Sequence, residues 1–153
     1  MATRIKPLTS ELYEKDFYAW ASEQASLLRA GRFHELDMDH LVEEVDDLSG
    51  ALYRSVRSRV RTIMEHLLKL EYAPAKEPRA GWHDTILTQR RDLIDDLTPS
   101  LTPRIEAELE RHFGRARDSA SRSFRRHGEN AAADALPERC SYTLEQLVGD
   151  WLP

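Results

Sequence analysis

Residues 37–48, DMDHLVEEVDDL, place acidic side chains around one histidine. The residues of this stretch that would share one face of a helix are His40, Glu43, Glu44 and Asp47. Carboxylates and an imidazole one turn apart could contribute ligands to a divalent cation. One helix supplies only part of a coordination shell, however, and the sequence shows no second set of ligands. We therefore expect no metal, and we interpret these residues as a solvated acidic face, with a partner-binding surface as the alternative.

Polar side chains also interrupt the apolar sides of the predicted helices. They could line a pocket for a small ligand, or they could form a closed network in the core, because buried polar groups need hydrogen-bond partners. A network that sets helix register is the more common role of such groups. The candidate residues of this polar pocket are Gln24, His66, Lys69, Trp82, Gln89 and Arg90.

Arginines gather in two regions of the chain. Clustered arginines are typical of a surface that binds phosphate or nucleic acid, but no aromatic residues alternate with these arginines to stack bases. A solvated face is the simpler interpretation, and nucleic acid is not the expected partner. The candidate basic face comprises Arg54, Arg57, Arg61, Arg122, Arg125 and Arg126. Other arginines in the same region as the last three are Arg111, Arg115 and Arg117.

Familiar catalytic motifs are absent from the sequence. It contains no glycine-rich phosphate loop and no H-E-x-x-H pattern. None of its histidines follows a glutamate at the spacing of a carboxylate-bridged di-iron site. We therefore assign no catalytic residue, expect no cofactor, and favour a protein without catalysis of its own.

The longest element that positions these residues is a predicted helix over residues 38–72. Its apolar residues recur every three or four positions, which is the period of an α-helix. The pattern continues across Gly50, although a glycine in a helix interior costs about 1 kcal/mol relative to alanine. Asp37 is the expected N-cap. The residues expected to face the core are Leu41, Val45, Leu48, Leu52, Val56, Val60, Ile63, Leu67 and Leu70.

Three more core helices are expected over residues 10–30, 82–97 and 102–127, with a C-terminal helical cap over residues 129–153. Gly31 suits a left-handed end of the first helix, and Thr143 and Gln146 have the spacing of a capping box. The apolar stripe of the first helix is expected at Tyr13, Phe17, Trp20, Ala21, Leu27 and Leu28. These elements predict an all-α fold, a four-helix, up-and-down-like bundle with one long central helix, in a single domain over residues 1–153.

Length and composition limit the classes of protein to which this chain can belong. A chain of 153 residues fits one domain and can bury a core without disulfides. The net charge of −5 argues against a general nucleic-acid or anionic-membrane binder. No apolar run has the length of a secretory signal core or of a membrane span. We therefore expect a cytoplasmic protein that does not bind a membrane.

Several separate blocks of the sequence together resemble a known family. The blocks are YEKDFYAWASEQASLLRAGRF, LDMDHLVEEVDDL, HLLKLEYAP, GWHDTILTQRRDLI, LTPSLTPRIEAEL and PERCSYTLEQLVGDWLP. In this order they resemble the bacterial domain-of-unknown-function family twenty-nine, from about Tyr13 to Pro153. The resemblance implies an all-helical single-domain protein, and it transfers no catalytic role because the family has no established activity. The blocks include residues named above, among them Trp20, Glu43 and Arg90, together with Asp16.

The function expected from these observations is that of a small helical interaction or adaptor protein. Its expected partner is a second copy of the chain, giving a homo-oligomer, or another protein. The first alternative is a ligand-binding or enzymatic bundle with a polar pocket around His66, Trp82 and Gln89. The second is a nucleic-acid-associated regulator that uses the arginine-rich helix faces.

Overall fold

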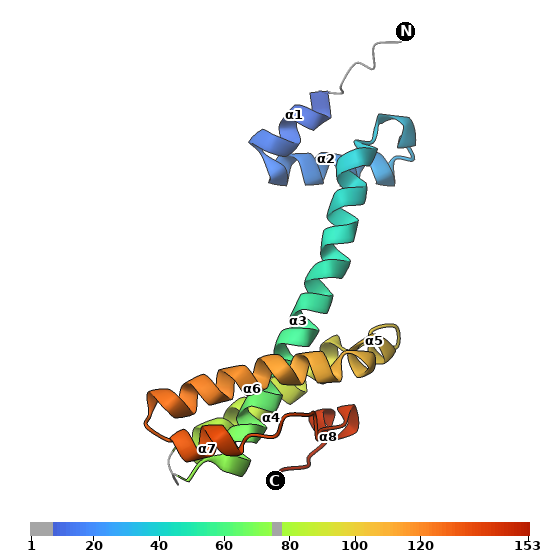
Figure 1. The fold of residues 1–153 in the computed structure, drawn as a ribbon. Coiled ribbons are helices and arrows are strands. Elements are labelled where there is room, and N and C mark those ends of the chain that lie inside the picture. The colour runs from blue at the N-terminus through green and yellow to red at the C-terminus, as the bar shows by residue number, and fades with distance from the viewer. Residues whose placement is uncertain (1–7, 75–77) are drawn as a thin grey trace. The chain divides into compact units, whose positions relative to one another are not determined.

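The computed structural model describes residues 8–74 and 78–153, and within them all regular elements are helical (Figure 1). The first elements in chain order are α1 (Leu8–Lys15), α2 (Phe17–Arg29), the 3-10 helix η1 (Phe33–Glu35) and α3 (Met38–Tyr72). They are followed by α4 (Arg79–Asp96), α5 (Thr102–Ala107), α6 (Leu109–Arg126), α7 (Asn130–Ala135) and α8 (Leu144–Val148). The predicted all-α class and the long helix over residues 38–72 are confirmed.

The helices belong to two compact units, Met1–Ala51 and Leu52–Pro153. The helix α3 runs without interruption from the first unit into the second. The single domain expected over residues 1–153 stays a prediction. No helix in the described part of the chain is long and apolar enough to cross a membrane.

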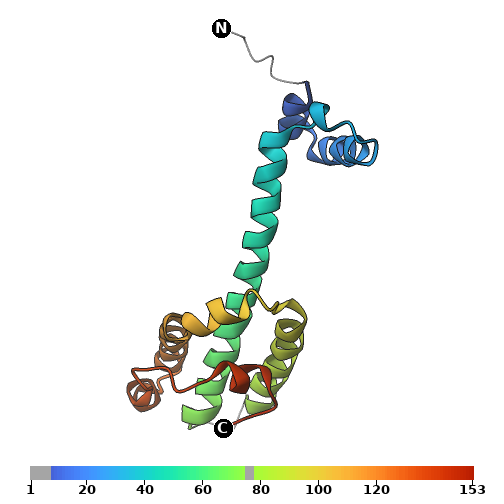
Figure 2. The ribbon, with the colours of Figure 1, turned by 90° about the vertical axis from the view of Figure 1, so that its right-hand side faces the viewer.

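The second unit is built around the later turns of α3, where the predicted apolar residues are buried. Val56, Val60 and Ile63 have no exposed surface, and burying each such side chain contributes about 1.5–3 kcal/mol. Figure 2 shows α4 and α6 on either side of this part of α3. They add further side chains to the same core, namely Ile86, Leu93, Phe113, Ala116, Ala120 and Phe124.

The C-terminal residues complete this core. Leu136, Tyr142 and Leu147 are buried within it, as expected of the predicted cap. The predicted capping box is present, because the Thr143 side chain accepts from the backbone N–H of Gln146 while the Gln146 side chain accepts from that of Thr143. The predicted helix over residues 102–127 is two helices, α5 and α6, which are separated at Glu108.

In the first unit, the predicted helix over residues 10–30 is also two helices. Asp16 leaves the helical conformation, and its carboxylate accepts a hydrogen bond from the backbone N–H of Ala19, which caps α2. Gly31 has a φ of +70°, the left-handed conformation predicted for the residue that follows this helix. Trp20 and Leu27 are buried as expected.

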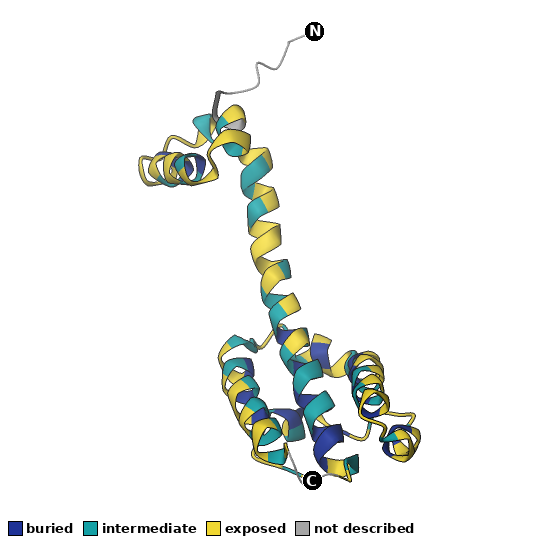
Figure 3. Cartoon of the chain, turned by 90° about the vertical axis from the view of Figure 1, so that its left-hand side faces the viewer, coloured by how far each residue is buried: buried dark blue, intermediate teal, exposed yellow. Residues whose placement is uncertain are grey.

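The expectation that the apolar stripe is buried along all of α3 is wrong for its first turns. The side chains of Val45 and Leu48 are 62% and 71% exposed, and Figure 3 shows that burial increases toward the later turns of the helix. The likewise expected burial of Phe17 and Leu28 is wrong, since both are exposed. Tyr13 on α1 contacts His40 and Glu44 on α3. The side of α3 that carries Val45 stays exposed to solvent.

Candidate functional site

The buried carboxylate of Asp37, directly before α3, is the centre of a polar cluster in the first unit. Its Oδ2 atom lies 3.2 Å from the indole Nε1 of Trp20 and 2.7 Å from Nδ1 of His40. Because a carboxylate accepts hydrogen bonds, both nitrogens donate. The backbone N–H of Asp37 donates to Oε1 of Gln24 at 2.8 Å. Asp37 was the expected N-cap, and the structure shows its side chain holding α2 against the start of α3.

Aromatic rings cover this Asp37 cluster. Tyr13 stacks on the His40 imidazole with ring centroids 3.9 Å apart, and Trp20 meets Tyr13 edge-on at 4.9 Å. The Tyr13 hydroxyl donates to Oε1 of Glu44 at 2.6 Å, and this hydrogen bond raises the pKa of Tyr13 to about 12. The imidazole is therefore fixed by a carboxylate at one edge and by a ring on one face.

The residues of the predicted acidic face have different environments. His40 and Glu44 are partly buried and bind Asp37 and Tyr13, whereas Glu43 and Asp47 are exposed. In the described part of the chain, no group of three or more His, Cys, Asp or Glu side chains is arranged to hold a metal ion. A role of the exposed acidic residues in binding a partner stays a prediction.

Of the predicted polar-pocket residues, Arg90 on α4 has the most extensive contacts. It is buried, and its guanidinium donates to the backbone oxygens of Leu147, Gln146 and Trp151 at 3.0, 2.8 and 2.5 Å. These oxygens lie at and just beyond the C-terminal end of α8, where helix carbonyls lack partners within the helix. Arg90 therefore anchors the C-terminal segment to α4.

His66 and Lys69, two other polar-pocket residues of the second unit, make polar contacts within their own helix, α3. Nδ1 of His66 lies 2.8 Å from the carbonyl oxygen of Thr62, and burial lowers the pKa of His66. Lys69 donates to Oε1 of Glu65 at 2.6 Å. Trp82 packs partly buried against the core, and Gln89 is partly buried.

Gln24 belongs to the first unit, where it binds Asp37. Within the described residues, no hydrogen bond joins two of the six polar-pocket side chains to each other. A pocket shared among the second-unit residues stays a prediction.

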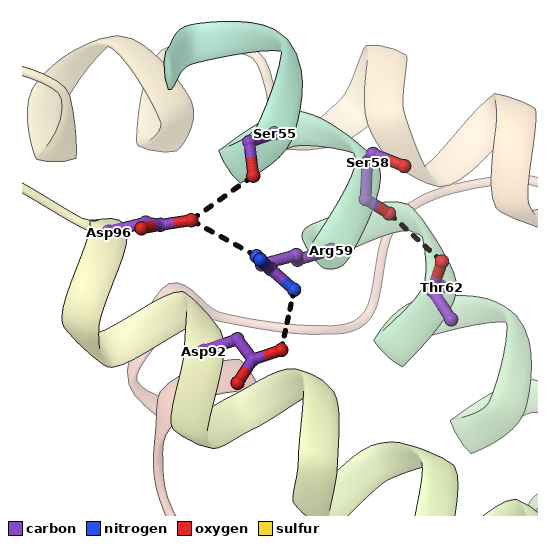
Figure 4. A network of polar contacts seen from close by, with 6 residues as sticks. All are labelled: Ser55, Ser58, Arg59, Thr62, Asp92 and Asp96. Carbon is purple, nitrogen blue, oxygen red and sulfur yellow. Dashed lines mark hydrogen bonds and ion pairs between the residues drawn. The ribbon is translucent and has the colours of Figure 1, made fainter. Parts of the chain in front are cut away.

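An ion-pair network between α3 and α4 involves residues that the sequence analysis did not single out (Figure 4). Arg59 donates from Nη1 to Asp92 at 2.8 Å and from Nε to Asp96 at 3.2 Å, and the Ser55 hydroxyl donates to the same Asp96 oxygen at 3.1 Å. Because Asp92 and Asp96 are one turn apart on α4, one guanidinium can bind both carboxylates. The network fixes the position of α3 along its axis relative to α4.

A second polar cluster lies between α3 and α6 around Glu108. The Tyr53 hydroxyl donates to Oε2 of Glu108, and the same oxygen lies 3.3 Å from Nε2 of His112. His112 has no exposed surface, and its Nδ1 lies 3.3 Å from Nε of Arg61. The Arg104 guanidinium lies 3.7 Å above the Tyr53 ring, a cation–π contact.

The predicted basic-face residues are distributed along two helices. Arg57 and Arg61 lie on α3 beside the Glu108 cluster, since Arg57 is 5.4 Å from the centroid of the Tyr53 ring and Arg61 is 3.3 Å from His112. Arg125 forms an ion pair with Asp134 at 2.7 Å. The remaining members are exposed, namely Arg54, Arg122 and Arg126.

The family assignment follows from a match over nearly the whole chain. The model of the family "Domain of unknown function DUF29" matches residues 12–152. The chain belongs to this family. The resemblance expected from the sequence blocks is confirmed, and a comparison with curated proteins returned no match.

A solved structure of similar fold supports the all-α architecture of this DUF29 protein. It is a crystal structure of an alpha-helical protein of unknown function from Rhodospirillum rubrum. It is 25% identical to the DUF29 chain, with a TM-score of 0.67, and the match covers 90% of this chain and 89% of the other.

The DUF29 sequence contains only a weak signal for the residues that the sequence analysis missed. Glu108 and His112 are four residues apart, as are Asp92 and Asp96, so each pair shares a helix face. Such spacing is common on solvated helices and does not identify a contact. The partners that make these pairs informative, Arg59 and Arg61, come from a different helix.

Proposed function

We propose that this DUF29 protein is a cytoplasmic interaction module that binds a cationic amphipathic helix of another protein through the first turns of α3. The observation that supports it is a run of exposed apolar side chains at helical spacing, Met38, Val42, Val45 and Leu48. Exposed acidic side chains lie on the same turns, namely Asp39, Glu43 and Asp46. We call these seven residues the α3 face.

The distribution of apolar side chains favours an interaction surface in this region. Among residues 11–51, the buried apolar side chains are those of Trp20 and Leu27. The large apolar side chains that stay exposed are Phe17, Tyr18, Leu28, Phe33, Met38, Val42, Val45 and Leu48. Single exposed apolar residues are ordinary, but a contiguous run marks a surface that a partner covers. Each Å² covered contributes about 25 cal/mol.

Charge determines which kind of partner fits the α3 face. From residue 33 to residue 53 the chain has no Lys or Arg, whereas acidic residues are frequent. A second copy bound through the same face would bring like charges together, which is unfavourable. A helix with apolar residues on one side and Lys or Arg beside them would match both the apolar run and the acidic residues by packing its apolar side against α3.

The test measures binding of two synthetic 18-residue helical peptides with identical leucine positions, one with lysines and one with glutamates at the polar positions. Fluorescence anisotropy should show binding of the lysine peptide, weakening as salt increases, and no binding of the glutamate peptide. The variant Val45→Ser/Leu48→Ser should bind the lysine peptide about tenfold more weakly or worse. The matched control is Leu87→Ser/Ile94→Ser on α4, which removes two similarly exposed apolar side chains and should leave binding unchanged.

Two outcomes would contradict this proposal. Equal loss of binding in both double variants would show that the peptide recognises apolar surface in general. Light scattering could instead detect a dimer that dissociates in Val45→Ser/Leu48→Ser. That result would show that a second copy covers the α3 face, as in the homo-oligomer that the sequence analysis expected.

A further inference from the structure

Four arginines converge where α3 lies beside α6. Arg57 and Arg61 are one turn apart on α3, and Arg111 and Arg115 are one turn apart on α6, so each pair shares a helix face. The contact of 3.3 Å between Arg61 and His112 places the two helices side by side at this level. Burial lowers the pKa of Arg61, and the positive charges of Arg57, Arg115 and Arg111 lower it further. We call these four residues the arginine cluster.

The four guanidinium groups of the arginine cluster are not paired directly with carboxylates in the part of the chain that the structure describes. Within the described residues, no ion pair involves any of its four members. Neighbouring arginines are paired: Arg59 binds Asp92 and Asp96, and Arg104 lies 3.6 Å from Glu108. In a chain with a net charge of −5, enough acidic residues exist to neutralise the cluster. The cluster therefore presents a concentrated positive charge that an external anion would relieve.

The base of the arginine cluster is held in place by the buried side chain of His112 and the groups that contact it. Nδ1 of the buried His112 accepts from Arg61, and Nε2 of the same ring lies 3.3 Å from Glu108, which also binds the Tyr53 hydroxyl. Nε2 has no hydrogen bond of good geometry. A guanidinium that is already oriented loses less entropy when it binds a ligand.

We propose that the arginine cluster binds a ligand that carries two adjacent phosphate groups. Guanidinium groups match phosphate oxygens with paired hydrogen bonds, and two arginine pairs on two helices provide for more than one phosphate. Two guanidinium groups already lie over the Tyr53 ring, that of Arg104 at 3.7 Å and that of the cluster member Arg57 at 5.4 Å from its centroid, and they would compete with a base for stacking on this ring. A compact diphosphate fits these groups better than single-stranded nucleic acid, which needs stacking platforms.

The cluster lies among residues 52–153, whereas the α3 face lies in the first unit, so this inference does not depend on the proposed interaction function.

The test titrates the full chain with inorganic pyrophosphate in a calorimeter. Wild type should bind pyrophosphate more tightly than orthophosphate, and the variant Arg111→Gln/Arg115→Gln, which alters two exposed side chains, should bind about tenfold more weakly or worse. The control Arg91→Gln/Arg139→Gln removes the same charge at exposed positions outside the cluster and should bind as wild type does. The variant Arg57→Gln provides a second measurement from α3, and circular dichroism verifies that every variant is folded.

Further titrations identify the source of the phosphates. Binding of ADP with the affinity of pyrophosphate would support recognition of the diphosphate alone, and tighter binding of ADP would support a nucleoside diphosphate. Absence of pyrophosphate binding, or equal weakening in the cluster and control variants, would overturn the proposal. The proposal would also be overturned, in favour of nucleic acid, if the chain bound an oligothymidylate but not pyrophosphate and the variant Arg111→Gln/Arg115→Gln lost the oligothymidylate binding.

Discussion

The Nε atom of Arg61 lies 3.3 Å from Nδ1 of His112, a side chain without exposed surface. Because a guanidinium can only donate, Nδ1 accepts and the imidazole is in its neutral form. Burial lowers the pKa of His112, and the charge of Arg61 lowers it further, while Glu108 acts in the opposite direction. Protonation of this ring therefore opposes folding.

The free energy of unfolding should decrease as the pH falls below about 6.5. An unfolded histidine binds its proton near that pH, whereas folded His112, with its lower pKa, stays neutral. The unfolded state then binds more protons, so stability is complete above about 6.5 and is lost as pH falls through the folded pKa. His66 acts in the same direction, and each histidine contributes at most about 1.4 kcal/mol per pH unit. Urea unfolding at pH 7.5, 6.5 and 5.5 measures this slope.

His112→Leu should reduce that slope, because leucine fills the buried site without titrating. The control His127→Leu replaces an exposed histidine at the end of α6 and should leave the slope as in wild type. A wild-type slope in His112→Leu would show that the loss of stability comes from other groups.

Replacement of Arg90 should release the C-terminal segment. Arg90→Gln cannot reach all three carbonyl oxygens that the guanidinium binds, and hydrogen bonds from charged groups contribute about 1.5–3 kcal/mol each. We expect a loss of about 3 kcal/mol in the free energy of unfolding, with faster amide hydrogen exchange in α8. Arg91→Gln, at the exposed neighbouring position, should change stability by less than about 0.5 kcal/mol. Unchanged exchange in α8 of Arg90→Gln would exclude the anchoring role.

Removal of the Asp37 carboxylate should loosen the first unit. Asp37→Ala leaves the Trp20 indole and His40 without their acceptor, and we expect a loss of about 2–3 kcal/mol. The Trp20 indole N–H resonance should shift and exchange faster with solvent. Asp37→Asn keeps an acceptor oxygen and should lose less, and Asp39→Ala, at an exposed position two residues later, should leave the resonance in place. An unshifted resonance in Asp37→Ala would contradict the observed contact.

Much of the second unit could be predicted from apolar periodicity. Val56, Val60 and Ile63 are buried as expected, and the capping box at Thr143 is present. These features depend on interactions within a few turns of chain, which spacing reveals. The breaks at Asp16 and Glu108 were missed because the apolar pattern continues across both residues.

The candidate sites were less predictable, because their contacts join residues far apart in the chain. Arg90 and Trp82 were grouped by their positions on a helix, but the partners of Arg90 are carbonyl oxygens of the C-terminal segment. Backbone acceptors carry no residue-type signal. Likewise, nothing near His112 in the sequence indicates Arg61 as its partner.

The sequence by itself determined the helical class, the length of α3 and which side of that helix is apolar. The tertiary structure decided that this side is buried at Val56 and open at Val45 and Leu48. The physical reason is that periodicity arises within one helix, whereas burial requires a second element to pack on it. The tertiary structure also decided the environments of the acidic residues around His40: Glu44 binds Tyr13, and Glu43 faces water.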